Sequence, residues 1–147
     1  MSGMCFLKAR MCLHVLCLQG LVGQLAKKLY NCTVIGSCGG PAKCELVKSK
    51  YGFDHAIDYK TTPDAASLRA ALKAVAPGGI DMYFENVGGH HFEAAFNSLK
   101  PGGRIAVCGG ISSYNDAQAK PIAINPLQMI YTAQRIEGLL DFGRHYS

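Results

Sequence analysis

Short apolar runs alternate with segments of helical periodicity along most of this 147-residue chain. Three of the runs lead into a Gly-Gly pair: Thr33–Ile35 before Gly39-Gly40, Ile80–Phe84 before Gly88-Gly89, and Ile105–Val107 before Gly109-Gly110. Parallel strands that are buried on both faces have continuous apolar runs of this kind. Glycine beyond the carboxyl end of a strand lets a ligand approach the backbone. The pattern therefore predicts a parallel sheet with a ligand-binding edge.

Periodicity and capping signals assign most of the chain to helices and strands. Apolar residues at helical spacing predict an amphipathic helix over 18–30, and Asp64 is expected to cap a later helix. The expected helices span 18–30, 41–51, 64–75, 90–99 and 126–132, and the expected strands span 33–37, 56–58, 80–84, 104–108 and 136–140. Pro101-Gly102-Gly103 is predicted to be a turn and 112–121 a polar loop. This alternation predicts an α/β fold with a doubly wound parallel sheet.

Composition and charge narrow the possible partners. The chain has 15 Lys and Arg residues against 10 Asp and Glu residues, which gives a formal charge of +5. These basic residues are scattered, whereas nucleic-acid binders carry a basic stripe, so we expect no nucleic-acid partner. A modest positive charge also suits an anionic small molecule. The apolar stretch 11–22 is interrupted by His14 and Gln19 and is too short to cross a bilayer, so neither a membrane partner nor secretion is expected.

The cysteines and histidines give no metal-binding pattern. None of the seven cysteines forms a CxxC pair, and their odd number predicts free, reduced thiols in a cytoplasmic protein. His90 and His91 are adjacent, so on a helix their side chains diverge, and we expect an exposed helix start rather than a metal site. Glu85, at a strand end beside Asn86, fits a carboxylate that orients a loop as well as it fits a catalytic acid.

The segment after the strand at 33–37 bears on the type of cofactor. In dinucleotide-binding folds a carboxylate at this point holds the ribose of NAD. Here Gly36–Gly40 contains no carboxylate, and Lys43 follows in the first turn of the next helix. A lysine near a helix N-terminus attracts a 2′-phosphate, which a carboxylate would repel. The segment therefore favours NADP(H), while an ordinary surface role for Lys43 stays open.

Five blocks of sequence occur in the order in which a known enzyme family has them. They are Val22–Lys27, Gly39–Cys44, Gly52–Lys60, Tyr83–Gly89 and Arg104–Asn115. From about Leu21 to Gly138 the chain resembles the NADP-dependent double-bond reductases of enones and alkenals, such as prostaglandin reductase and 2-alkenal reductase. They form part of the zinc-free branch of the medium-chain dehydrogenase/reductase superfamily. The resemblance implies a Rossmann-type domain for NADP(H) and a small enone or enal as substrate.

The resemblance also implies roles for individual residues. Lys43 matches the lysine that holds the 2′-phosphate, Tyr59 a tyrosine near the adenosine, and Asn86 an asparagine beside the diphosphate and ribose. Tyr114 matches a tyrosine near the nicotinamide ribose and the substrate, whose phenol can donate a hydrogen bond to a developing enolate oxygen. A loop tyrosine that seals the sheet edge is the alternative. The loop expected to wrap the nicotinamide half consists of Cys108, Gly109, Gly110, Ile111, Ser112, Ser113 and Tyr114.

The chain departs from the family in two places. The family's glycine-rich turn after the first strand falls on Leu16–Gln19, which contains no glycine. We therefore expect a divergent segment 1–19 with a degenerate first strand, an NADP-binding domain 20–140 and a tail 141–147. The family's catalytic domain has no counterpart in this sequence, which predicts little or no reductase activity. A non-catalytic module that binds partners or binds nucleotide weakly is the alternative, and a homodimer through the last strand is possible in either case.

Overall fold

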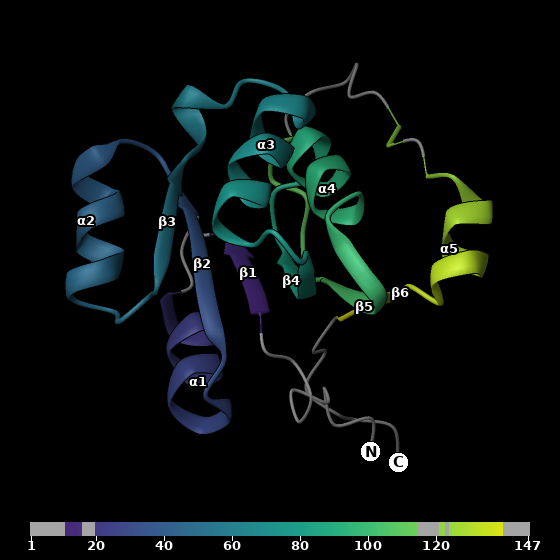
Figure 1. The fold of residues 1–147 in the computed structure, drawn as a ribbon. Helices are drawn as coiled ribbons and strands as arrows, with labels where there is room; N and C mark the ends of the chain where they lie inside the picture. Colours follow the sequence, from purple (N-terminus) through teal and green to yellow (C-terminus); the bar gives the residue numbers. More distant parts are fainter. Residues whose placement is uncertain (1–10, 16–19, 115–120, 123, 140–147) are drawn as a thin grey trace, which may run out of the picture.

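The strands form a parallel sheet whose order reverses at its centre. The computed structural model describes residues 11–15, 20–114, 121–122 and 124–139. The described strands are β1 (Met11–Val15), β2 (Thr33–Cys38), β3 (His55–Asp58), β4 (Ile80–Glu85), β5 (Leu99–Val107) and β6 (Arg135–Gly138), in the spatial order β3-β2-β1-β4-β5-β6. The helices between them are α1 (Gly20–Tyr30), α2 (Pro41–Ser49), α3 (Ala65–Val75), α4 (Gly89–Phe96) and α5 (Pro126–Thr132) (Figure 1). This order confirms the predicted doubly wound sheet and places its switch point between β1 and β4.

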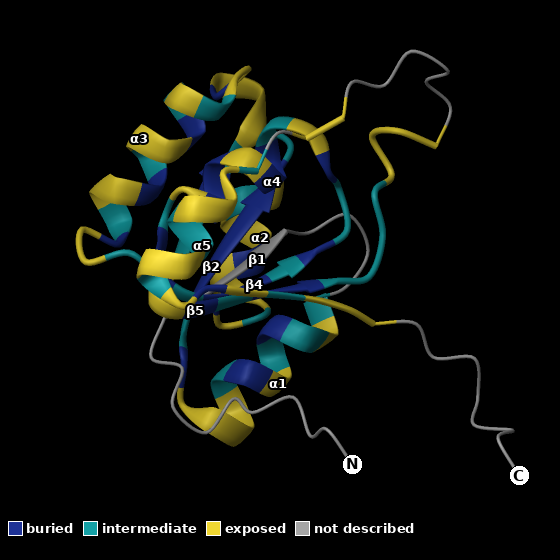
Figure 2. Ribbon diagram, turned by 90° about the vertical axis from the view of Figure 1, so that its right-hand side faces the viewer, coloured by how far each residue is buried: buried dark blue, intermediate teal, exposed yellow. Residues whose placement is uncertain are grey.

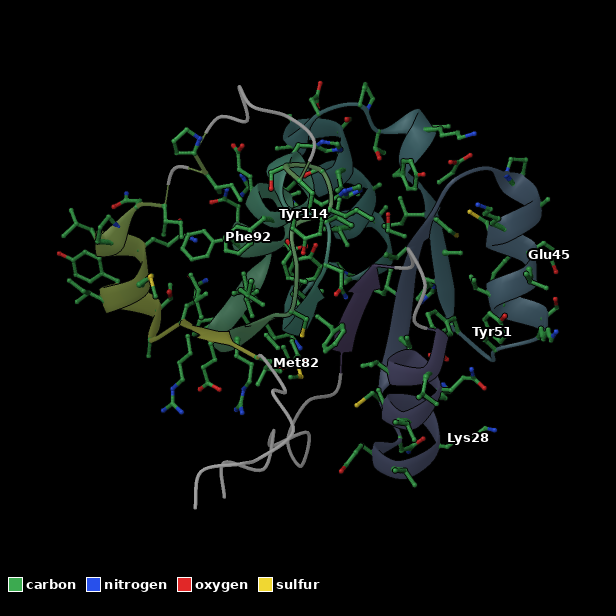
Figure 3. All side chains as sticks on the ribbon, turned by 180° about the vertical axis from the view of Figure 1, so that it is seen from behind. Lys28, Glu45, Tyr51, Met82, Phe92 and Tyr114 are labelled. Atoms are coloured by element: carbon green, nitrogen blue, oxygen red, sulfur yellow. The ribbon has the colours of Figure 1, made fainter. Side chains whose placement is uncertain are left out.

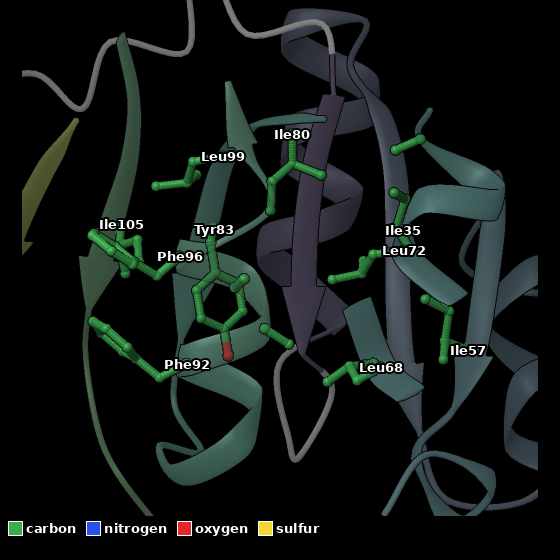
Figure 4. Close-up of a cluster of buried hydrophobic side chains, with 13 residues drawn as sticks. Ile35, Ile57, Leu68, Leu72, Ile80, Tyr83, Phe92, Phe96, Leu99 and Ile105 are labelled. Atoms are coloured by element: carbon green, nitrogen blue, oxygen red, sulfur yellow. The ribbon is translucent and has the colours of Figure 1, made fainter. Parts of the chain in front are cut away.

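Two apolar clusters fill the two faces of the sheet. In one cluster, side chains from α3 and α4 surround Tyr83 of β4, with Phe92 and Phe96 packed beside it (Figure 4). In the other, Val47 of α2 and Phe53 pack against β2. Figure 2 shows β2 and β4 largely buried and the outer faces of the helices exposed. Because helices cover both faces, the strands need apolar side chains on both sides, which explains their continuous apolar runs.

Strand β1 lies at the centre of the sheet, in the segment where only the resemblance placed a degenerate first strand and the apolar pattern predicted none. Its backbone pairs with β2 from Met11 opposite Thr33 to Val15 opposite Ser37, and its other edge pairs with β4. The apolar stretch 11–22 leads directly into a helix, so its periodicity could not separate a strand from helix. The predicted glycine-free turn at residues 16–19 lies outside the described residues.

Strand β5 begins earlier than predicted, because the expected turn is a bulge within the strand. Leu99 pairs with Ile80 and Arg104 pairs with Met82, so the residues between Leu99 and Arg104 are looped out of register. Gly102 has a φ of 75°, which favours glycine. A Cβ on residue 103 would lie 2.8 Å from a backbone oxygen. The glycines are thus needed here, but they bend one strand instead of starting it.

Helix starts follow the signals in the sequence. The Asp64 carboxylate accepts a hydrogen bond from the Ser67 backbone N–H at 2.7 Å, which confirms the predicted cap of α3. Asn125 caps α5 in a similar way through the N–H of Leu127. None of the helices in the described part of the chain is long and apolar enough to pass through a bilayer.

Candidate functional site

Two loops meet at the carboxyl ends of β4 and β5. The first follows Glu85 and contains Asn86 and the Gly88-Gly89 pair, and the second runs from Cys108 to Tyr114. Backbone N–H groups of the second loop donate to carbonyl oxygens of the first. These bonds run from Cys108 and Gly109 to Glu85, from Ile111 to Asn86 and from Ser112 to Val87, at 2.9 to 3.2 Å. The two loops are therefore held together as one surface.

Glu85 organises the first loop from beneath. It is 1% exposed, and its Oε1 accepts hydrogen bonds from the backbone N–H groups of Val87 and, at 2.8 Å, Gly88. Burial raises the pKa of the Glu85 carboxyl, and the two backbone hydrogen bonds oppose that shift. Of the two roles that the sequence left open, the geometry favours the loop-orienting one.

Tyr114 closes the second loop over its own glycines. Its Oη accepts a hydrogen bond from the Gly110 N–H at 3.1 Å, which leaves the phenolic proton for another acceptor. A Cβ on residue 109 would lie 2.9 Å from this Oη, so glycine is what lets the tyrosine fold back. Tyr114 is 68% exposed, which does not favour the alternative of a loop tyrosine that seals the sheet edge.

A cleft of about 1050 Å³ opens beside these loops. Its walls come from the two loops, from Phe92 of α4 and from Leu139 beyond β6, and Cys108, Gly109, Gly110, Ser112, Ser113 and Tyr114 of the predicted nicotinamide loop all line it. Figure 3 shows Tyr114 and Phe92 at this end of the molecule. Its size is that of a small-molecule site.

Lys43 lies at a second part of the same edge, in the first turn of α2. This helix starts at Pro41 without a side-chain cap, so its first N–H groups and the positive end of its dipole face outward. Lys43 is exposed and makes no ion pair with another described residue. The Gly40 N–H is already engaged, since it donates to Asp58 Oδ1 at 2.8 Å. An anion here would therefore meet the lysine and the first helical turn, with the Asp58 carboxylate close by on Gly40.

Tyr59 lies between the loop at Gly39 and His91 of α4. Its hydroxyl oxygen would be 2.7 Å from a Cβ on residue 39, so Gly39 is required for the tyrosine to lie over the loop. On its other side the ring makes an edge contact with His91, at 5.6 Å between centroids. The structure thus places Lys43 and Tyr59 near the ends of β2 and β3, and Asn86 and Tyr114 near the ends of β4 and β5.

His91 is a site residue that the sequence did not identify. It was expected at an exposed helix start, and this is wrong for His91, which is 5% exposed. Its Nε2 lies 3.5 Å from Ser37 Oγ, and its Nδ1 is buried without a hydrogen-bond partner among the described residues. Burial lowers the pKa of His91 to about 4, with a smaller contribution from the neighbouring His90. The only sequence signal was the pair of adjacent histidines, and helical position alone does not tell which of the two faces the sheet.

The described residues contain no group of three or more His, Cys, Asp or Glu side chains placed to hold a metal ion. The expectation that the side chains of His90 and His91 diverge is wrong, because their rings stack on each other with centroids 4.5 Å apart. The four cysteines in this part of the chain, Cys32, Cys38, Cys44 and Cys108, are free thiols.

Comparison with protein families gives a match over most of the chain. The family model described as zinc-binding dehydrogenase matches residues 20–144. The NADP(+)-dependent 2-alkenal reductase of Nicotiana tabacum is 48% identical over 126 residues, which cover 86% of this chain and 35% of the relative. Prostaglandin reductase 1 of Oryctolagus cuniculus is 41% identical over 120 residues, 82% of this chain and 33% of the relative. The chain thus spans about a third of the length of the curated relatives it matches.

A solved structure is similar to this chain in both fold and sequence. CurA from Vibrio vulnificus, in complex with NADPH, superposes with a TM-score of 0.78 at 36% identity, over 92% of this chain and 41% of CurA. The resemblance inferred from the five sequence blocks is confirmed by these matches.

Proposed function

Because the chain belongs to the zinc-binding dehydrogenase family, we propose that it is the NADP(H)-binding domain of a reductase that acts on the C=C bond of enones or enals. Relatives of this substrate class and an NADPH-bound structural neighbour support the proposal. The observation that carries it is Lys43, exposed in the uncapped first turn of α2 at the end of a strand that lacks a carboxylate. This arrangement suits the 2′-phosphate that distinguishes NADP(H) from NAD(H).

The residues of the sheet edge fit a dinucleotide in an extended conformation. Lys43 would hold the 2′-phosphate, and Tyr59 would cover the adenosine end above Gly39. Among the described residues the buried His91 Nδ1 has no hydrogen-bond partner, and a polar group of the cofactor would supply one. Asn86 would lie beside the diphosphate and ribose, and the loop from Cys108 to Tyr114 would hold the nicotinamide half along the cleft.

Bound NADPH supplies a hydride, which in this chemistry adds to the β-carbon of the substrate. Tyr114 would then act on the oxygen of the resulting enolate. Its phenolic proton remains free, because its Oη is only an acceptor in the bond with Gly110. A hydrogen bond from this proton would stabilise the negative charge that develops on the enolate oxygen, and could also serve to protonate it.

The test is a titration of the chain with NADPH and with NADH. The chain contains no tryptophan, so the emission of the reduced nicotinamide can be followed without interference from the protein. We expect micromolar binding of NADPH and weaker binding of NADH. No binding at millimolar NADPH would refute the proposal for this chain.

The substrate class needs a separate measurement, because the chain alone is expected to turn over little or no substrate. Saturation-transfer NMR with a small enal should detect binding to the cleft in the presence of NADP⁺ and none in its absence. Equal enal binding with and without NADP⁺ would count against a substrate site beside the nicotinamide.

Strand β6 supports a further part of the proposal, a homodimer. It forms the edge of the sheet, pairs with β5 on one side, and leaves Arg135, Glu137 and Gly138 exposed. An edge strand of this kind can pair with the same strand of a second copy. Sedimentation of the chain should show a dimer. Gly138→Pro should dissociate it, because Leu139 N–H donates to Val107 of β5, so the N–H of the preceding Gly138 faces the free edge, and proline cannot donate to a strand ladder. The free thiols of the described residues agree with a cytoplasmic, reducing location.

A further inference from the structure

Two cysteines face each other beside the predicted 2′-phosphate site. Cys38 is the last residue of β2 and Cys44 lies in α2, and their Sγ atoms are 3.2 Å apart. The Cys38 thiol donates a hydrogen bond to Cys44 Sγ. From this juxtaposition we propose that Cys38 and Cys44 form a reversible disulfide that closes the loop Gly39–Lys43 and alters the cofactor site.

The surroundings allow the two sulfurs to meet. A disulfide bond is about 2.05 Å long, so the sulfurs must approach by about 1.2 Å. The chain between the two cysteines includes Gly39 and Gly40, and the Cβ position of Gly40 has no atom within 4 Å. The space beside Gly40 gives room for the movement, although Tyr59 lies against Gly39 and the Gly40 N–H donates to Asp58, so these two contacts must shift with the loop.

The two thiols differ in accessibility, which sets the order of the reaction. Cys44 is partly exposed, whereas Cys38 is 2% exposed and packs in the apolar cluster with Val47 and Phe53. Burial, together with the hydrogen bond to Cys44, raises the pKa of Cys38 to about 12. Cys44 is therefore the sulfur that meets an external oxidant first, and Cys38 is the resolving thiol.

Glutathione disulfide supplies the oxidising equivalents in this scheme. The Cys44 thiolate attacks one sulfur of glutathione disulfide, the S–S bond breaks, and one glutathione thiolate leaves. Cys38 then loses its proton to solvent and attacks the Cys44 sulfur, which releases the second glutathione. Two protein thiols become one disulfide and one glutathione disulfide becomes two glutathione molecules, so electrons and atoms balance.

The disulfide is expected to weaken cofactor binding, and this part rests on the proposed function. Lys43 directly precedes Cys44 in α2, so drawing Cys44 towards β2 also displaces the lysine and the first helical turn. We expect NADP⁺ affinity to fall by about tenfold on oxidation, the loss of roughly one charge-assisted hydrogen bond. By linkage, bound NADP⁺ must favour the dithiol by the same factor.

The first experiment detects the bond without any nucleotide. The reduced chain is equilibrated in glutathione buffers, free thiols are blocked, and the chain is digested with trypsin under non-reducing conditions. Cleavage after Lys28, Lys43 and Lys48 places the two cysteines on separate peptides, Leu29–Lys43 and Cys44–Lys48. A disulfide therefore appears as a linked pair, and fragmentation distinguishes Cys38 from Cys32 on the first peptide.

We expect the linked pair in the wild type and in Cys108→Ser, a control that removes a half-buried thiol of the nicotinamide loop. It must be absent in Cys44→Ser, a substitution at a partly exposed position that packs at the edge of the buried cluster. Absence of the pair in the wild type, or linkage through Cys32, overturns the proposal.

The second experiment measures NADP⁺ affinity for the oxidised and reduced forms. Weaker binding to the oxidised form supports the coupling, and equal binding refutes it. If the linked pair is present but neither form binds NADP⁺, the proposed cofactor role is refuted. The proposal that Cys38 and Cys44 form a disulfide is still supported in that case.

Discussion

His91 should make the fold sensitive to acid. In the folded chain its imidazole is 5% exposed, with Nε2 close to Ser37 Oγ and Nδ1 buried without a partner among the described residues. Burial holds its pKa at about 4, against an ordinary value of 6.5, so the folded state favours the neutral ring. When the chain unfolds, the ring takes up a proton more readily. Stability from this group is complete above pH 6.5 and is lost as the pH falls towards 4.

The size of the effect follows from the shift. Each pKa unit corresponds to about 1.4 kcal/mol. The fall in the His91 pKa from 6.5 to about 4 therefore limits the loss in the free energy of unfolding to about 3 kcal/mol. Between pH 7 and pH 5 the unfolded ring becomes protonated while the folded ring stays mostly neutral. Linkage then predicts that the free energy of unfolding falls by about 2 kcal/mol over this interval because of His91. The raised pKa of Glu85 acts in the opposite direction, so total stability alone does not isolate His91.

Comparison of variants isolates the contribution of His91 to the pH dependence of stability. Urea unfolding of the wild type, His91→Asn and His55→Asn, followed by circular dichroism at pH 7 and pH 5, gives three pH dependences. His91→Asn should lack the loss of about 2 kcal/mol, whatever its stability at pH 7. His55→Asn, which removes a half-buried histidine on β3, should retain the loss because His91 is still in place. If His91→Asn loses as much stability as the wild type, the buried neutral histidine is not the cause.

Two substitutions test the packing that supports the site. Gly23→Ala in α1 would place a Cβ 2.1 Å from the ring of the buried Phe53, so we expect a loss of about 1–3 kcal/mol in urea unfolding, where an unobstructed helical position would gain stability. A gain would show that Phe53 moves aside easily. Glu85→Ala leaves two loop N–H groups without their acceptor and should cost at least about 2 kcal/mol more than Glu85→Gln, which keeps an acceptor oxygen. Equal losses in chemical denaturation would show that these hydrogen bonds do not hold the loop.

Most of the architecture was predictable, because burial on both faces of a parallel sheet leaves a strong pattern. The apolar runs before each Gly-Gly pair became β2, β4 and β5, and α5 has the predicted bounds, Pro126–Thr132. Strand β1 was not predictable by this route, since its short run merges with the helix that follows. Its place is fixed by pairing with β2 and β4, and both partners are distant in sequence.

The position of a candidate site residue was predictable where its charge, or a neighbouring glycine in the sequence, indicates a particular place in the fold. Lys43 could be inferred from the missing carboxylate and the helix start. The contact between Tyr59 and Gly39 depends on two loops that only the folded sheet brings together. The same is true of His91 and Ser37, which are 54 residues apart along the chain. Local patterns do not record such pairings, so these contacts required the structure.

We propose that this sheet edge recognises the 2′-phosphate of NADP(H) through Lys43. Calorimetric titration with adenosine 2′,5′-bisphosphate and with adenosine 5′-monophosphate tests it directly, because these ligands differ in that phosphate and do not use the nicotinamide half of the site. The wild type should prefer the bisphosphate, and Lys43→Glu should lose about tenfold to a hundredfold of that preference. Lys28→Glu, an equal charge change at the far end of α1 (Figure 3), should keep it. No preference in the wild type, or an equal loss in both variants, would contradict the account.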